Sequence, residues 1–477
     1  MLEGSGPNDS TRDSRRFTGW IVGLTALGVV TRLVALLLAG DLEPYADESN
    51  YLYLALCWNR FSVYSDSALY LWPPGYPFFL AVFLRVLGAE GVFAAKLCQV
   101  LLDAVVGATI MLLARRLFKR AAALVAGILW CGYVPLIGFT HYLWPETLFL
   151  AVFLPGLYLF VDWWLESATG CATGRKLMTA GLLIGLSLLI KEVGLWWCAV
   201  LCALILWRDC RQSIVGAVAR SALFMLSVMV VVLPWTLRNV EVYGRYAPVG
   251  ATLGQNVYFG MNGFYANFDY PPAMNRKLGR RPNWFSRPAD EIWARSPALN
   301  IIDRSAENAA RGLQFARERP MYMLRTRVKK LADWATPLSF FIRHCAMDIY
   351  GGALSKGGLR RLLIIAALIM PMLVMGGAIP GFFWALQVPG ARTLVGWSLL
   401  YFVPVTALIN GMSRYRIVIE PLLIVLAAGF VVRLARVLRG REKVAFPIAA
   451  CGGAWLVLVL LWLINVEEST TMIREAW

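Results

Sequence analysis

The acidic pair Asp47 and Glu48 is the first chemical signal in the sequence. It follows a long apolar run by only a few residues and stands just before the aromatic Tyr51. Ionisable side chains at a membrane boundary are costly and usually serve a function. A carboxylate beside an apolar wall tends to have a raised pKa, which suits a general base. The pair therefore predicts acid–base chemistry at a membrane surface.

Cations that suit phosphate are the second signal. Arg414, Tyr415 and Arg416 come just before another long apolar run, and arginine holds phosphate through paired, charge-assisted hydrogen bonds. Lys191 lies at the end of a further apolar run, and Arg238 opens a long polar segment. A carboxylate base together with phosphate-binding cations at the lipid boundary predicts an acceptor hydroxyl and a lipid-phosphate donor.

Four other residues are candidates for contacts with substrate. Tyr51 suits an interfacial aromatic belt or stacking on the face of a sugar. The other three are polar and fall at predicted turns between apolar runs, namely His141, Glu146 and Glu192. With the acidic pair and the cations, they complete one set of residues that we expect at a single face of the membrane.

Simpler interpretations stay open for several of these residues. Glu146 could be a helix N-terminal charge that the helix dipole favours. Lys191 and Glu192 could pair with each other at a turn. Arg414 and Arg416 could serve only as interfacial anchors, with their aliphatic stems in the apolar layer.

The elements that must position these residues are membrane helices. Hydrophobic residues make up 59% of the chain and charged residues only 16%, with a mean hydropathy of +0.60. Several apolar runs reach the roughly 18 to 25 residues that cross a bilayer. The net charge of +17 lies largely at the ends of these runs or in one long segment, so no nucleic-acid partner is expected. The nine cysteines show no metal-ligand or redox spacing and suit small hydrophobic positions.

Basic residues predict the orientation of the first helices. Three arginines precede the apolar run at 17–40, which makes residues 1–16 a cytoplasmic tail. The basic cluster at 115–120 is placed in the cytoplasm by the same rule. Residues 41–91 then form one external loop with interfacial helices, because the apolar part of 73–88 is too short to span the bilayer.

Alternation across the bilayer predicts about eleven transmembrane helices in an all-α polytopic protein. Residues 238–356 form a long external loop, which is partly helical because 301–320 has helical spacing with Asp303 as its N-terminal cap. Residues 357–464 supply the C-terminal transmembrane helices, and 465–477 form an external tail. All the candidate residues then lie on the external side.

A series of motifs resembles a known family. The segments occur in the order ADESNYLYLA, PPGYPFFLAVFLRVLG, RRLF, WPETLF, LIKEVGL, LPWTLRNVEVYGRYAPVG and SRYRIVIEPLLIVLAA. Together they resemble the type C (GT-C) glycosyltransferases, in particular the protein O-mannosyltransferases and the bacterial lipid A aminoarabinose transferases. The resemblance runs from about Phe17 to Arg439, and its specificity lies in the order of the motifs.

The resemblance implies a GT-C fold with a catalytic module of seven helices at 17–237 and a cap at 238–356. It implies a sugar donor carried on polyprenyl phosphate, such as undecaprenyl phosphate, and an active site at the periplasmic or external face of the cell (plasma or inner) membrane. Asp47 matches the acid that acts as base, with Glu48 beside it. The segment 414–416 would lie near the carrier phosphate.

Inversion is the expected outcome of the transfer, because a single displacement needs only one carboxylate to take the proton of the acceptor hydroxyl. Glu48 would project in a different direction from its neighbour Asp47. The acceptor could be a glycan, a lipid or a protein, and the sugar a hexose, a pentose or an aminosugar. No cofactor is certain: with only His141 and His344 as histidines, a divalent metal stays open but is not indicated.

The alternative is a secondary transporter or flippase for a lipid-linked or anionic solute. Transporters usually show internal repeats, and the sequence has none. Arg32, about halfway along the first apolar run, is the feature that a transporter would also explain. Its simpler interpretation is an ion pair with an acid from another helix.

Overall fold

The computed structural model describes residues 7–40, 42–45, 47–64, 71–167, 172–261, 300–355, 357–388, 391–409, 411–442 and 447–477. Over these residues the secondary structure is helical, without strands, as the sequence predicts. The α-helices are α1 (Pro7–Ala39), α2 (Asp47–Phe61), α3 (Gly75–Leu87), α4 (Gly91–Phe118), α5 (Arg120–Gly132), α6 (Val134–Phe139), α7 (Glu146–Ser167), α8 (Gly174–Ile190), α9 (Leu195–Asp209), α10 (Ile214–Tyr243), α11 (Leu253–Met261), α14 (Ile301–Glu318), α15 (Pro320–Ala335), α16 (Phe340–Ala346), α17 (Gly358–Ala385), α18 (Ala391–Ala407), α19 (Ser413–Arg416), α20 (Glu420–Leu438), α21 (Ile448–Ile464) and α22 (Val466–Ala476).

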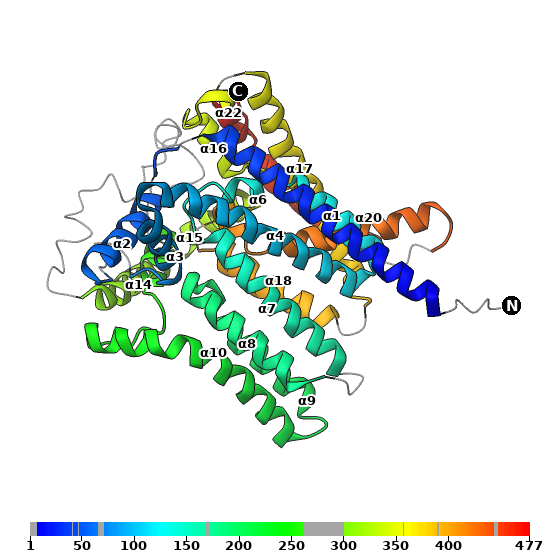
Figure 1. Cartoon of the computed structure of the whole chain (residues 1–477), viewed down its shortest axis with the longest axis horizontal. Helices are drawn as coiled ribbons and strands as arrows, with labels where there is room; N and C mark the ends of the chain where they lie inside the picture. The colour runs from blue at the N-terminus through cyan, green and yellow to red at the C-terminus, as the bar shows by residue number, and fades with distance from the viewer. Residues whose placement is uncertain are drawn as a thin grey trace.

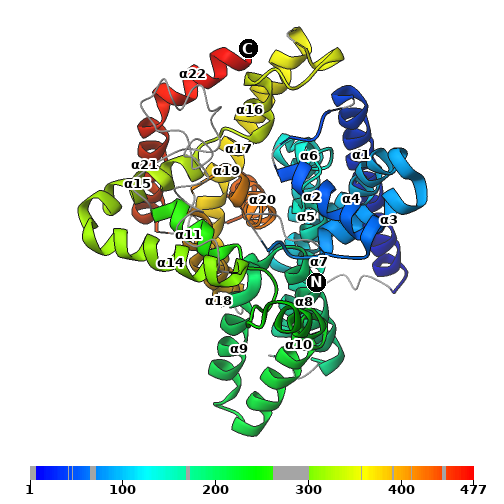
Figure 2. The ribbon, with the colours of Figure 1, turned by 90° about the vertical axis from the view of Figure 1, so that its left-hand side faces the viewer.

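Long helices form the body of the protein. Helix α4 packs against α1, α5 and α7, while α8 packs against both α7 and α10. Figure 1 shows these helices running together, with α2, α3 and α14 gathered at the end that lies away from the N-terminus. Figure 2 looks onto that end and places α2 and α19 near its middle. The segments that carry the first acids and the arginines therefore meet at one face.

Six helical segments of the described chain are long and apolar enough to cross a membrane, and a seventh is gained if α21 and α22, bent by 60° at their junction, count as one span. The chain thus has the make-up of a multi-pass membrane protein. The predicted total of about eleven spans is not confirmed. Besides α21, which has 17 residues, four of the expected spans form helices of only 13 to 17 residues, namely α5, α8, α9 and α18.

The segment expected as an interfacial helix at 73–88 forms α3. Gly88 ends this helix with φ 59°, a left-handed conformation that glycine adopts without strain. At Gly91, where α4 begins, a Cβ atom would lie only 2.5 Å from the carbonyl oxygen of Phe83. These two glycines let the chain fold back, so that α3 packs against α4.

One of the eleven predicted spans is the apolar run from 121 to 139. In the structure this run is broken at Tyr133, which has an extended backbone between α5 and α6. Pro135 explains the break, because it has no N–H to donate and its ring clashes with a continuing helix. As a result, the residues that follow α6 turn inside the protein. Thr140, His141 and Trp144 are all buried there.

The described part of the long polar segment contains the helices α11, α14, α15 and α16 joined by turns. Its middle, residues 262–299, lies outside the described residues. The predicted cap Asp303 is wrong. Asn300 caps α14, and its side chain accepts hydrogen bonds from the backbone N–H groups of Ile302 and Asp303, each at 3.0 Å. Helix α14 begins earlier than the charge pattern suggests, so Asp303 lies in its first turn and pairs with Arg245 at 2.9 Å.

Arg32 lies fully buried inside the bundle and pairs with Asp103 of α4, which confirms the simpler interpretation of this residue. Its guanidinium lies 4.0 Å from the centre of the Trp130 ring and donates to the Trp130 carbonyl at 3.0 Å. The indole N–H of Trp130 donates in turn to Asp103 at 3.1 Å. The network ties α1, α4 and α5 together and leaves both charges satisfied.

Replacing Asp103 by asparagine should strongly destabilise the protein. The change leaves the buried charge of Arg32 without its counter-ion, and breaking a buried pair in this way costs about 3 to 5 kcal/mol. We expect a clear fall in the thermal unfolding midpoint of the purified protein in detergent. The double variant Arg32→Met with Asp103→Leu is the control and should be milder. A single variant as stable as the parent would contradict the role of this pair.

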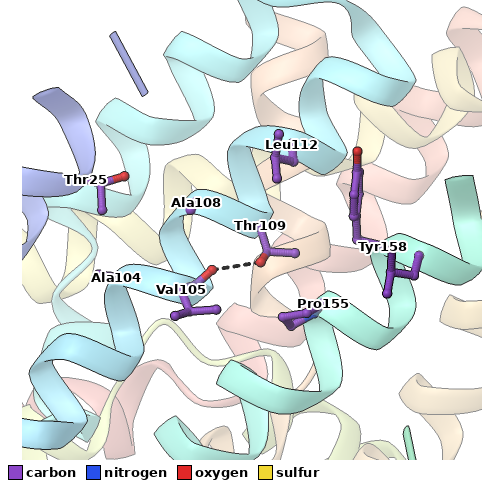
Figure 3. A pocket seen from close by; sticks show the side chains of 9 residues that line it. Thr25, Ala104, Val105, Ala108, Thr109, Leu112, Pro155 and Tyr158 are labelled. Atoms are coloured by element: carbon purple, nitrogen blue, oxygen red, sulfur yellow. Dashed lines mark hydrogen bonds between the residues drawn. The ribbon is translucent and has the colours of Figure 1, made fainter. Parts of the chain in front are cut away.

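A groove of about 520 Å³ opens between α1, α4 and α7. Figure 3 shows Thr25, Thr109 and Tyr158 among the side chains around it, and the Thr109 hydroxyl donates to the Val105 carbonyl. Its lining is almost wholly apolar and carries no charged side chain. The groove therefore offers no group for the predicted chemistry, and the candidate site has to be sought at the end of the bundle that α2 covers.

Candidate active site

Helix α2 begins at the acidic pair, whose charges suit the positive end of the helix dipole. The two side chains have different surroundings. Glu48 is buried and accepts hydrogen bonds from the backbone N–H groups of Leu143 at 2.6 Å and Tyr45 at 2.9 Å. Burial raises the pKa of the Glu48 carboxyl. Glu48 therefore joins the start of α2 to the buried turn after α6, while Asp47 remains partly open.

Asp47 belongs to a four-residue charge cluster. Its carboxylate lies 2.6 Å from Nη1 of Arg414, and Nε of the same guanidinium lies 2.6 Å from Glu146 Oε1. Lys191 Nζ approaches the same oxygen of Glu146 at 2.8 Å. We call Asp47, Glu146, Lys191 and Arg414 the charge cluster. Its members come from α2, α7, the turn after α8, and α19, so it exists only in the folded chain.

Exposure differs sharply across the charge cluster. The Asp47 side chain is 32% exposed, whereas Glu146 is fully buried and Arg414 is 9% exposed. Burial lowers the pKa of Lys191, although the negative charge of Glu146 acts in the opposite direction. For Arg414 burial acts in the same direction, but the carboxylates of Glu146 and Asp47 outweigh it and raise its pKa well above the usual value. Arg414 stays charged, and Asp47 is the more exposed of the two acids in the charge cluster.

An aromatic wall flanks the guanidinium. The centre of the Trp144 ring lies 4.0 Å from the Arg414 guanidinium carbon, a distance typical of a cation–π contact. Trp144 also meets the ring of Phe340 at 5.0 Å and that of His344 at 6.0 Å. One face of Arg414 is therefore covered by protein, and the wall is apolar enough to strengthen the charges beside it.

The two arginines of the SRYR segment, Arg414 and Arg416, bind different partners. Arg416 is buried, pairs with Glu420 at 3.0 Å and donates to the carbonyls of Trp334 at 2.5 Å and Thr336 at 2.7 Å. Its hydrogen bonds join α15 to α20. Tyr415, between the arginines, lies with its ring centre 5.5 Å from Lys191 Nζ. Of the three residues, Arg414 alone belongs to the charge cluster.

Lys191 and Glu192 do not pair with each other, contrary to the simpler interpretation. Lys191 binds Glu146, while Glu192 accepts hydrogen bonds from the hydroxyl and the backbone N–H of Thr252. Burial raises the pKa of Glu192. Glu192 thus anchors the segment after α10 rather than the charge cluster.

Arg238 is also engaged elsewhere. It donates to the Tyr64 carbonyl at 3.1 Å and lies over the Trp235 ring at 4.9 Å. It also donates to the Tyr243 hydroxyl at 3.3 Å and to Asn239 Oδ1 at 3.2 Å. These contacts join the end of α10 to the chain after α2, so the structure gives Arg238 no contact with the charge cluster.

Tyr51 and His141 are both buried. The Tyr51 ring packs 4.9 Å from Trp72 and 5.2 Å from Tyr76, and burial together with the nearby charge of Asp47 raises the pKa of its hydroxyl. His141 Nε2 lies 3.1 Å from the Tyr350 hydroxyl, and burial lowers the pKa of the imidazole to about 3. Tyr51 borders the charge cluster, whereas His141 belongs to the core beneath it.

Sequence reasoning missed Trp144 and Lys96. Trp144 stands two residues before Glu146 in WPE. Its position beside a predicted site acid is the sequence feature that could have identified it as a site residue. Lys96 is buried in α4, close enough to Glu48 for its charge to lower the pKa of that carboxyl in part. Nothing in its local sequence distinguishes it from an ordinary interfacial lysine. Among the described residues, no three or more His, Cys, Asp or Glu side chains gather as ligands for a metal ion.

Comparison with known families gives one match. The sequence profile described as dolichyl-phosphate-mannose-protein mannosyltransferase matches residues 72–237. The resemblance to the type C glycosyltransferases is thereby confirmed. The matched segment runs from just before α3 into α10 and contains Glu146 and Lys191, whereas Asp47 and Arg414 lie outside it.

Two solved structures of ArnT from Cupriavidus metallidurans are similar to this chain. The one bound to undecaprenyl phosphate has 14% sequence identity and a TM-score of 0.41, covering 88% of this chain and 79% of that one. The apo structure has 15% identity and a TM-score of 0.37, covering 88% of this chain and 78% of that one. No curated protein matches the sequence.

Proposed function

We propose that the protein is a membrane glycosyltransferase that moves a sugar from a polyprenyl-phosphate carrier to an acceptor hydroxyl. The observation that carries the proposal is the charge cluster, in which a partly exposed carboxylate touches a buried, permanently charged arginine. The match of residues 72–237 to the mannosyltransferase family supports the same reaction class. The helices that are long and apolar enough to cross a membrane would place the protein in the bilayer, which also holds the lipid tail of the carrier.

In the proposed reaction the acceptor oxygen attacks the anomeric carbon of the sugar and forms the new glycosidic bond. The bond from that carbon to the phosphate oxygen breaks, and its electron pair leaves with the polyprenyl phosphate. The acceptor proton passes to Asp47. Arg414, with Lys191 beside it, stabilises the negative charge that develops on the leaving phosphate. No other reactant is needed.

The surroundings of the acids favour a single displacement with inversion. Asp47 is 32% exposed, while Glu146 is fully buried against two cations and Glu48 is bound to backbone N–H groups. A double displacement would need a second accessible carboxylate as nucleophile. Asp47 is therefore the base in our proposal. Glu146 holds the two cations in place, and Glu48 fixes the turn after α6 through the backbone N–H of Leu143.

The proposed site faces the periplasm or the exterior, in a plasma or inner membrane. This placement rests on the basic residues at the opposite ends of the helices, such as Arg115 and Arg116 in the last turn of α4 and Lys119 just after it. We propose in addition that the described parts of the cap, 244–261 and 300–355, lie on the acceptor side.

Mass spectrometry of lipid extracts and glycosylated products from cells with and without the gene tests the proposal. Without the gene, one polyprenyl-phosphate sugar should accumulate and one glycosylated product should disappear. Purified protein in vesicles should then release free polyprenyl phosphate from that donor. If the purified protein instead moved the intact lipid-linked sugar across the bilayer, the alternative of a flippase would replace the transferase.

A further inference from the structure

The guanidinium of Arg414 is already engaged by two carboxylates. Nε donates to Glu146 and Nη1 donates to Asp47, both at 2.6 Å, while Trp144 covers one face. A phosphate that binds arginine with two parallel hydrogen bonds uses either the Nε and Nη2 pair or the two terminal nitrogens. Each of these edges holds one carboxylate. A phosphate can therefore gain a paired contact only where a carboxylate yields.

The two carboxylates are not equally held. Glu146 is fully buried and binds Lys191 at 2.8 Å as well as Arg414, so releasing it would strand charges inside the protein. Asp47 is 32% exposed, and its single ion pair among the described residues is with Arg414. Water can solvate Asp47 when the pair opens. Asp47 is thus the partner that yields, at the edge formed by the two terminal nitrogens.

We infer that the carrier phosphate and Asp47 compete for Arg414, so that binding of the donor itself frees the base. The inference rests on the proposed function. In the unloaded protein the two acids balance the two cations, and Asp47 is held by Arg414. In the loaded protein the phosphate takes the terminal nitrogens of Arg414, and its negative charge repels Asp47 toward the acceptor. The base thereby becomes available only when there is a donor to use it.

Binding of undecaprenyl phosphate to the purified full-length protein in nanodiscs tests the inference. Asp47→Asn removes the competing charge, so it should bind this probe roughly two- to fivefold more tightly than the parent, which is the upper part of the range expected for loss of a partly exposed ion pair. Asp47→Ala should show the same tightening, which guards against an effect of asparagine itself. Glu43→Gln is the matched control, because it removes an exposed carboxylate four residues away and should leave the affinity unchanged.

Arg414→Ala separates the inference from the proposal on which it rests. It should weaken binding of undecaprenyl phosphate by at least about tenfold, as expected for loss of a charge-assisted paired contact. If Arg414→Ala binds like the parent, the phosphate site of the proposed function is wrong. If Arg414→Ala weakens binding while both Asp47 variants bind no better than Glu43→Gln, the site stands and the competition is refuted.

Discussion

Purified Asp47→Asn protein should transfer sugar about 10² to 10⁴ times more slowly than the parent, which is the usual contribution of a positioned general base. Asparagine keeps the shape of the side chain but cannot accept the acceptor proton. Because Asp47 is partly exposed at the start of α2, the change should leave the fold intact. The measurement is the initial rate of sugar transfer from the donor lipid in nanodiscs.

Glu48→Gln is the control for this prediction. Its side chain is buried and fixes the backbone of Tyr45 and Leu143, and a glutamine oxygen can keep accepting one of those hydrogen bonds. We expect a milder loss of activity that follows the loss of thermal stability. A transfer rate of Asp47→Asn within a few-fold of the parent would show that the proton goes elsewhere, with Glu48 and Glu192 as the next residues to change.

Arg414→Ala should have the second largest effect, a fall in turnover of about 10² to 10³, because one preorganised donor to a developing negative charge contributes that much. Arg414→Lys should not restore the loss. A lysine ammonium is a point charge without the planar fork, so it cannot bind Glu146 and a phosphate in the geometry that Arg414 provides. Steady-state rates of the two variants against donor concentration give the comparison.

Arg416→Lys is the matched control two residues along the same segment. Arg416 binds Glu420 and the carbonyls of Trp334 and Thr336, so the change should lower the unfolding temperature while the folded fraction keeps its turnover. The outcome that speaks against the assignment is full activity of Arg414→Lys, since an interfacial anchor needs only a positive charge on a long stem.

The sequence alone predicts that four residues share one side of the membrane, namely Asp47, Glu146, Lys191 and Arg414. Each lies at or next to the end of an apolar run, and the positions of basic residues predict which ends share a side of the membrane. Helix ends that share a side can meet in space even when the chain separates them by 268 residues, as in the pair of Glu146 and Arg414. Topology is thus a long-range constraint that a single sequence carries.

The sequence does not specify the direction in which each side chain of a short turn or helix points. Arg414 and Arg416 were expected to act together, yet α19 is only four residues long and side chains two positions apart project to different sides of a helix. Arg414 faces the charge cluster and Arg416 faces α15. The same holds for Lys191 and Glu192, which end on different partners. These choices depend on the packing of distant helices, which no local pattern records.

The buried pair of Arg32 and Asp103 has a consequence for biosynthesis. The two residues are 71 positions apart, and at about 5 to 20 residues per second α4 follows α1 out of the ribosome roughly 4 to 14 seconds later. During that interval the apolar part of the first helix carries an unpaired arginine seven residues from its end. An arginine within a membrane span costs up to about 2.5 to 3.5 kcal/mol on insertion scales, the value for the helix centre. Arrival of α4 removes this cost. We therefore expect newly made α1 to stay near the translocon until Asp103 emerges, and we expect the α1–α4 contact to form early in assembly.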